Sequence, residues 1–171
     1  MAANTQKVTY TEEVLAEEIS QTELYARAKG WSATSHASTH AVLQPEKKQA
    51  GVLVARAKML LTMVGPGGLV EQPIWYTIIV RVQQGRYRYW LTDYQLARAG
   101  KLLPLESQLA PTLPQQERQA NETRFMPVSL HSKAVIIGLQ AAMRKPVARP
   151  KKADPLAPYK VGFPGAGSPQ R

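Results

Sequence analysis

Aromatic and cationic side chains alternate along one face of a predicted β-hairpin, and this pattern is typical of a surface that binds anionic ligands. Trp75 and Arg81 lie on its first arm, and Arg88 and Trp90 lie on its second arm. Tryptophan rings stack on bases or sugars, and arginine neutralises phosphate groups. The candidate binding face consists of Trp75, Thr77, Ile79, Arg81, Arg88, Trp90 and Tyr94 from the hairpin, with Arg56 and Lys58 from the preceding strand.

These side chains are positioned by a hairpin that the sequence predicts over residues 73–96. β-Branched and aromatic residues fill both arms, and Gln84-Gly85 between them is typical of a two-residue turn, because Gly85 tolerates a positive φ angle. The turn fixes the register, since a slip of one residue would exchange the two faces. On the binding face the expected cross-strand pairs are Arg81–Arg88, Ile79–Trp90, Thr77–Thr92 and Trp75–Tyr94. The other face, which we expect to be buried, carries Tyr76, Ile78, Val80, Val82, Tyr87, Tyr89 and Leu91.

The sequence offers no group of residues for catalysis or for a cofactor. Its histidines are His36, His40 and His131. Without cysteine or a neighbouring carboxylate they do not predict a metal site. Asp93 is the only acid between Glu71 and Glu106, so we expect a turn or cap residue rather than half of an acid–base pair. Residues 65–68 are glycine-rich but lack the Lys-Ser/Thr of a phosphate-binding loop. We therefore expect a protein that is not an enzyme and has no cofactor.

The chain is basic, with 22 Lys and Arg residues against 12 Asp and Glu residues and a formal net charge of +10. Residues 1–23 contain five Glu and one Lys, whereas residues 145–171 contain six basic residues and one Asp. A basic balance favours acidic partners such as nucleic acid, anionic lipid or cell-surface polymers. It also occurs in proteins without such a partner, so composition leaves these alternatives open.

Nothing in the sequence predicts a transmembrane segment or a signal peptide. No apolar run approaches the roughly 20 residues that a membrane-spanning helix needs, and the first residues lack the basic and apolar regions of a signal peptide. The Met-Ala-Ala-Asn opening fits either a native start or a new start joined to a mature chain. The absence of cysteine fits a cytosolic and an exported protein equally well.

Before the hairpin, the sequence predicts a strand, a helix and two further strands. Residues 7–14 alternate as a strand does, and Ser20-Gln21-Thr22-Glu23 is a capping box that opens a helix ending near residue 35. The helix is expected to bury Leu24, Ala28 and Trp31. A short strand is expected over residues 40–44 and a long one over residues 49–63. The buried side of the long strand carries Gly51, Leu53, Ala55, Ala57, Met59 and Leu61.

After the hairpin, the predicted structure is less regular. Residues 98–127 contain several prolines and little periodicity, so we expect an irregular connection with one helical turn near residues 115–119. A helix follows over residues 128–145, capped by Ser129 and stopped by Pro146. Its expected buried stripe consists of Leu130, Ala134, Ile137 and Ala141, widened by Ile136, Leu139 and Met143.

This order of elements predicts one α+β domain over residues 1–144. We expect a curved antiparallel sheet of about five strands, in the order β-α-β-β-β-β-α, with two helices packed on one face. Residues 145–171 are rich in Pro, Gly, Lys and Ala, so we expect a disordered basic tail. The second sheet face would remain open, to be covered by residues 98–127, by the tail or by a second copy of the chain.

Three stretches are specific enough to compare with known families. They are Glu23-Leu24-Tyr25 with Trp31, then Lys48-Gln49-Ala50-Gly51, and then Gly85-Arg86-Tyr87-Arg88-Tyr89 with Leu91-Thr92-Asp93. Together they resemble the bacterial domain of unknown function 4468 family, which has a TATA-box-binding-protein-like (TBP-like) fold. The resemblance covers residues 7–144, with 98–127 matched poorly. The family hairpin usually turns on Asp-Gly, whereas this chain has Gln84-Gly85.

The resemblance implies a TBP-like fold and a periplasmic or exported location. It implies no activity, because the family has none established, and a shared architecture does not transmit function. We therefore expect a non-catalytic binding module that engages a protein or an envelope polymer through the open sheet face or the basic tail. The alternative is nucleic-acid or polyanion binding through the aromatic and arginine residues of that face. A homo-oligomer formed through the open face is a further alternative.

Overall fold

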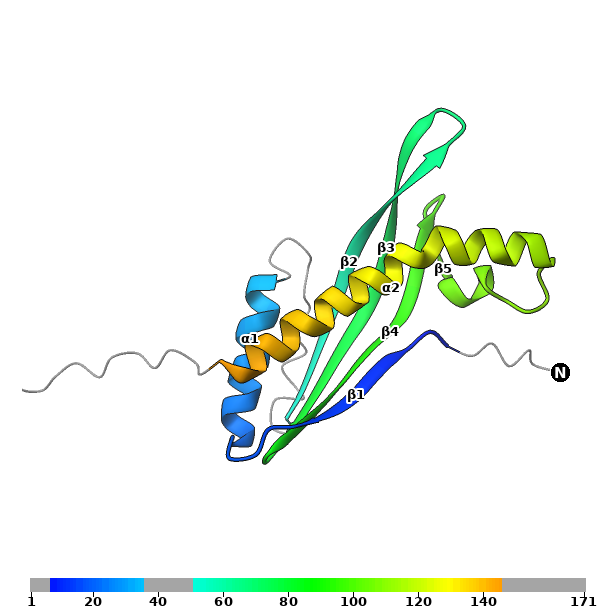
Figure 1. Cartoon of the computed structure of the whole chain (residues 1–171). Helices are drawn as coiled ribbons and strands as arrows, with labels where there is room; N and C mark the ends of the chain where they lie inside the picture. The colour runs from blue at the N-terminus through cyan, green and yellow to red at the C-terminus, as the bar shows by residue number, and fades with distance from the viewer. Residues whose placement is uncertain (1–6, 36–50, 146–171) are drawn as a thin grey trace, which may run out of the picture.

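A twisted antiparallel sheet lies against two helices in the computed structural model, which describes residues 7–35 and 51–145 (Figure 1). The strands are β1 (Tyr10–Leu15), β2 (Val52–Gly65), β3 (Gly68–Gln83), β4 (Arg86–Arg98) and β5 (Lys101–Pro104). The helices are α1 (Gln21–Ser35), the short 3₁₀ helix η2 (Leu105–Gln108) and α2 (Gln115–Arg144). The sheet order is β1-β4-β3-β2, and β5 pairs with the end of β4.

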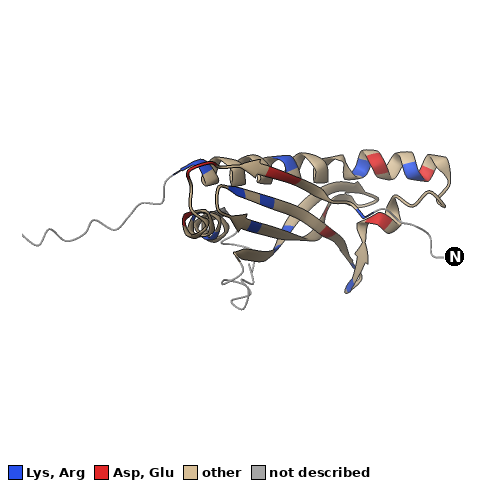
Figure 2. Ribbon diagram, turned by 90° about the horizontal axis from the view of Figure 1, so that it is seen from below, with Lys and Arg blue, Asp and Glu red and all other residues tan. Residues whose placement is uncertain are grey.

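Both α-helices pack on the same face of the sheet (Figures 1 and 2). Within the described ranges no helix covers the other face, which carries the candidate binding residues. The predicted class, an α+β fold with a five-stranded antiparallel sheet and helices on one side, is confirmed.

The fifth strand does not lie where the sequence predicted an additional strand. The strand expected over residues 40–44 lies outside the described residues. β5 instead falls in the segment 98–127 that was predicted to be irregular. Ala99 and Gly100 have φ angles of 48° and 74°, the combination that a tight hairpin turn requires. The chain therefore folds back so that Arg98 pairs with Lys101.

The β3–β4 hairpin has the predicted register from its turn to the middle of both strands. Gly85 has a φ angle of 75°, and the pairs run from Gln83–Arg86 to Thr77–Thr92. Beyond this point Asp93, with a φ angle of 56°, adds one residue to β4 as a β-bulge. The predicted Trp75–Tyr94 pair is therefore wrong, because Trp75 pairs with Gln95.

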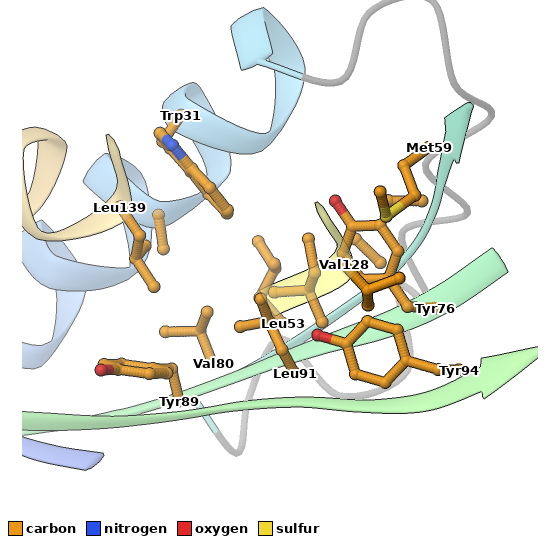
Figure 3. Packing of buried hydrophobic residues seen from close by; sticks show 14 of the residues in the cluster. Trp31, Leu53, Met59, Tyr76, Val80, Tyr89, Leu91, Tyr94, Val128 and Leu139 are labelled. Atoms are coloured by element: carbon orange, nitrogen blue, oxygen red, sulfur yellow. The ribbon is translucent and has the colours of Figure 1, made fainter. Parts of the chain in front are cut away.

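The core lies between the sheet and the two helices (Figure 3). In α1, Leu24, Ala28 and Trp31 are buried, as predicted. The Ser20 hydroxyl accepts a hydrogen bond from the Glu23 backbone N–H (3.2 Å). The reciprocal half of the capping box is absent from this helix, since the Glu23 carboxylate accepts from Arg27 instead. The predicted buried side of β2 is confirmed for Gly51, Leu53, Ala55, Ala57, Met59 and Leu61.

Polar contacts within the core join β3 and β4 to α2. The Tyr94 hydroxyl lies 2.7 Å from Ser132 Oγ, and Ser132 Oγ also donates to the Val128 carbonyl (2.7 Å). The Tyr76 hydroxyl lies 3.0 Å from His131 Nε2. Desolvation by burial raises the pKa of both tyrosines and lowers the pKa of His131. These groups are therefore uncharged at neutral pH.

The long helix α2 corrects the prediction for the last third of the chain. It begins at Gln115, includes Pro127 and has Pro114 rather than Ser129 at its N-cap. The prediction extended an irregular segment to Pro127 because residues 98–127 contain several prolines and little periodicity, and a proline in a helix interior lacks the N–H that the helix uses. Buried Phe125 and Val128 hold the helix against the core on both sides of the proline, so packing outweighs the local preference.

The buried stripe of α2 is also rotated from the predicted one. Leu130 and Ile137 are 61% and 66% exposed, and Ala134 and Ala141 are exposed as well. Of the expected flanking residues, Leu139 and Met143 are buried. The buried side of this helix consists of Asn121, Phe125, Val128, Ser132, Leu139 and Met143. Because Asn121 and Ser132 on this side are polar, the apolar periodicity of the sequence does not indicate that the side is buried.

Candidate binding face

The open face is the side of the sheet that carries no α-helix, and its side chains form cross-strand rows. One row runs Val52–Arg81–Arg88–Glu13 across β2, β3, β4 and β1, and the next runs Val54–Ile79–Trp90–Thr11. The third row is Arg56–Thr77–Thr92, and the fourth is Lys58–Trp75–Gln95. Eight of the nine predicted face residues therefore lie together. The structure does not place the ninth, Tyr94, on this face.

Tyr94 is fully buried on the helix side of the sheet. The bulge at Asp93 reverses the alternation of β4, so that Tyr94 stacks on Tyr76 with ring centroids 5.4 Å apart. Asp93 itself forms an ion pair with Lys7. The assignment of Tyr94 to the binding face is wrong for this reason, and Gln95 takes its place beside Trp75.

Positive charge is concentrated at the first row of the open face. Arg81 and Arg88 are directly opposite each other and both exposed. The carboxylate of Glu13 forms ion pairs with Arg88 (3.0 Å) and Arg86 (3.3 Å). In the described part of the chain, no carboxylate forms an ion pair with Arg81. Among the described residues, one acid thus pairs with two arginines, and the charge of the third is not balanced by an ion pair.

The two tryptophans of the open face are half-buried and lie beneath cations. The Arg88 guanidinium is 5.8 Å from the Trp90 ring centroid. Arg56 and Lys58 lie 5.4 Å and 5.5 Å from the Trp75 ring centroid. Cation–π attraction at such distances holds the flexible basic side chains against the sheet. The face therefore presents ordered cations rather than two bare aromatic rings.

Two shallow depressions adjoin on this face and share Arg81 and Trp90. One has a volume of about 240 Å³ and includes Glu13, Arg86 and Arg88 in its lining. The other has a volume of about 290 Å³ and is lined also by Val52, Ile79 and Thr92. A ligand that lies along the strands would meet charged groups in the first depression and mainly apolar groups in the second.

Sequence reasoning missed the contribution of β1 to this face. Glu13 supplies the only carboxylate of the four rows, and Thr9 Oγ1 lies 2.9 Å from Thr92 Oγ1 at its border. The alternation of residues 7–14 predicted a strand, but it did not indicate the strand with which this one pairs. Only the observed β1–β4 pairing places Glu13 beside Arg88.

The remaining candidates do not form a second site in the described residues. His36 and His40 lie outside them, and His131 contacts Tyr76 in the core. Across residues 7–35 and 51–145, no group of three or more His, Asp or Glu side chains is arranged to hold a metal ion. None of the helices within those same residues is both long enough and apolar enough to span a membrane.

The sheet and its helices define an α+β protein with a TBP-like fold, and the comparisons with known proteins agree. The model of a family described as a domain of unknown function (DUF4468) with TBP-like fold matches residues 10–96, about half of the chain. The chain belongs to this family, as the three resembling stretches indicated.

Solved structures that share the fold include two bacterial proteins. A crystal structure of a DUF4468 family protein from Bacteroides ovatus has a TM-score of 0.65 and 15% sequence identity, covering 84% of this chain and 90% of that one. A crystal structure of a TBP-like protein from Parabacteroides distasonis has a TM-score of 0.57 and 18% identity, covering 80% and 94%. No curated protein matches this sequence. At these identities the likeness concerns the fold alone.

Proposed function

We propose that the protein is a non-catalytic binding module whose open face holds acidic groups of a protein or of an envelope polymer. The observation that carries this proposal is the direct opposition of Arg81 and Arg88. Like charges opposite each other destabilise an antiparallel strand pair, so the fold gains nothing from this arrangement. An acidic group lying between the two guanidinium groups would reduce their repulsion and form charge-assisted hydrogen bonds with both.

The surroundings of the arginine pair support a partner that is extended rather than small. The rows continue through Ile79 and Trp90 to hydroxyl groups at Thr77 and Thr92, and then to the cations around Trp75. The Arg81 row and the Trp75 row are six residues apart along β3, so the distance between them is about 20 Å at 3.3 Å per residue. A polymer with repeated acidic groups can contact both ends of the face at once.

Nucleic acid is the second candidate, and the presence of two tryptophans beside arginines favours it. Bases bind such surfaces by stacking on exposed rings. Here basic side chains lie over both rings, so stacking would require them to move. A carboxylate or phosphate can instead bind to the cations in place. The geometry therefore supports anion recognition more than base recognition.

The proposal is tested by binding to poly-L-glutamate, to a polygalacturonate and to single-stranded DNA at several salt concentrations. We expect the Arg81→Ala/Arg88→Ala variant to lose most of its affinity for the carboxylated polymers. The matched control is Arg98→Ala/Lys101→Ala, which removes two opposed cations from the β4–β5 turn. Equal losses in both variants would mean that net charge alone drives binding, and the open face would not be the site.

The basic tail requires its own control. A full-length variant with Arg149, Lys151, Lys152 and Lys160 replaced by Gln keeps the chain length and the open face. If this variant loses all binding while the Arg81→Ala/Arg88→Ala variant keeps it, the tail is the binding element and the proposal for the face fails. If either carboxylated polymer is turned over, and Asp93→Ala abolishes the turnover, the proposal that the module is non-catalytic fails.

A further inference from the structure

The outer side of α2 carries an apolar stripe that the core does not use. Met126, Leu130 and Ile137 are 58%, 61% and 66% exposed, and the exposed Ala134 and Ala141 lie between and beyond them. The spacing of four, four, three and four residues places all five on one side of a helix. Single exposed apolar residues are ordinary, but a continuous stripe marks an interaction surface.

The charge along this stripe is mainly positive. From Met126 to Lys145 the chain contains Lys133, Arg144 and Lys145 and no Asp or Glu, and the exposed Glu122 lies one turn before Met126. The sequence continues with Arg149, Lys151 and Lys152 before its next acid, Asp154. An apolar stripe accompanied mainly by basic residues is typical of helices that lie in the interface of an anionic membrane.

We propose that the α2 stripe, consisting of Met126, Leu130, Ala134, Ile137 and Ala141, docks on the surface of an anionic lipid bilayer. The helix would lie parallel to the membrane, with its aliphatic side chains among the headgroups and Lys133 and the basic C-terminal end near lipid phosphates. α2 has 30 residues, about 45 Å at 1.5 Å per residue. It forms an outer layer of the molecule along most of its length, so a flat surface can reach it (Figure 2).

The charge at the middle of the stripe favours a membrane over a second copy of the chain. Lys133 lies near the middle of the stripe, so two stripes paired in either direction would bring the two Lys133 side chains close together. The nearest acid of α2 before them, Glu122, is eleven residues away along the helix and does not neutralise them. A phosphate-bearing surface satisfies the same lysine. The open face lies on the other side of the sheet from α2 (Figure 2), so it remains free when the stripe is docked.

Vesicle flotation tests this proposal with the full-length protein. The vesicles contain phosphatidylcholine alone or equal parts of phosphatidylcholine and phosphatidylglycerol. We expect binding to the anionic vesicles only, and a loss of about tenfold or more in the Leu130→Gln/Ile137→Gln variant, because two aliphatic contacts are removed. Both side chains are exposed, so the substitutions leave the core intact. The matched control is Val64→Gln/Leu69→Gln at the tip of the β2–β3 hairpin, where the two residues are 85% and 77% exposed.

The Arg81→Ala/Arg88→Ala variant separates this site from the open face, and we expect it to float as the native protein does. The proposal is overturned if that variant or the hairpin-tip variant loses vesicle binding while the Leu130→Gln/Ile137→Gln variant keeps it. The proposal is also overturned if neither the native protein nor any variant binds vesicles of either composition.

Lys133→Gln gives an independent readout. It should weaken vesicle binding, because it removes a cation from the docked surface. If the stripe were instead an interface between two copies, the same substitution would strengthen self-association in analytical ultracentrifugation, and that result would contradict the proposal.

Discussion

Arg81 and Arg88 lie directly opposite each other across the β3–β4 pair, in the row of the open face that ends at Glu13. Glu13 forms ion pairs with Arg88 and with Arg86, and none of the described residues provides such a carboxylate for Arg81. The hairpin register forces this opposition, because the neighbouring pairs bury Val80 against Tyr89 and Val82 against Tyr87. The arginine pair is therefore a cost to the fold that a bound acidic group would relieve.

Replacing Arg81 by Glu should raise stability while it removes binding. The new carboxylate would face Arg88, and we expect the free energy of unfolding to rise by about 0.2–1 kcal/mol. The gain should shrink at high salt, since both side chains are exposed. Urea denaturation at two ionic strengths measures the effect. A lower stability at low salt would show that the opposed arginines do not repel each other in the folded protein.

The Tyr94–Ser132 contact should respond unequally to removal of its two partners. Ser132→Ala leaves the Tyr94 hydroxyl buried and unpaired, which costs about 1–3 kcal/mol. Tyr94→Phe leaves Ser132 Oγ still bonded to the Val128 carbonyl, so the expected cost is nearer about 1 kcal/mol. Equilibrium unfolding of both variants tests the order. A larger loss in Tyr94→Phe would contradict the observed hydrogen bonding.

Stability should fall as the pH drops below neutrality, in part because of His131. Burial lowers its pKa from the ordinary value of 6.5, so the unfolded chain binds a proton at a pH where the folded protein does not. This contribution is present above the unfolded pKa and is lost as the pH falls through the lower folded pKa.

His131→Gln keeps a hydrogen-bonding group near Tyr76 and should show a flatter dependence between about pH 7 and pH 5, where histidine titrates. The measurement is the free energy of unfolding of both proteins across this range. Contributions from His36 and His40 are common to both, so the difference isolates His131. If the free energies of unfolding of the two proteins changed in parallel with pH, the contribution assigned to His131 would be contradicted.

Pro127→Ala should stabilise the protein. Pro127 is exposed within α2, and alanine would restore a backbone N–H that the helix can use. An interior proline costs a helix about 3 kcal/mol, part of which the structure relieves by adjusting locally, so we expect a gain of about 1–3 kcal/mol. Thermal and urea unfolding measure it. A loss of stability would mean that Phe125 and Val128 need the local backbone that proline imposes.

The sequence was sufficient to predict the β3–β4 hairpin but not the length or the buried side of α2, and the reasons are physical. A two-residue turn and strict alternation leave one register for β3 and β4, so the six face residues Trp75, Thr77, Ile79, Arg81, Arg88 and Trp90 of these strands lie on the predicted face. The only sequence signal for the bulge at Asp93 is the tolerance of aspartate for positive φ, which is weak. The bulge places Tyr94 in the core, where the sequence did not predict it. In α2, apolar residues occupy two sides. Leu130 and Ile137 fit a buried stripe as well as Leu139 and Met143 do, and only packing distinguishes them.

The central claim, that the open face is a binding surface for acidic groups, is tested most directly by nuclear magnetic resonance of the full-length protein titrated with poly-L-glutamate. We predict saturable shifts of the Trp90 and Trp75 indole N–H signals and of the Arg81 and Arg88 guanidinium signals, suppressed by salt. Shifts confined to residues 146–171, with these four side chains unmoved, would contradict the claim.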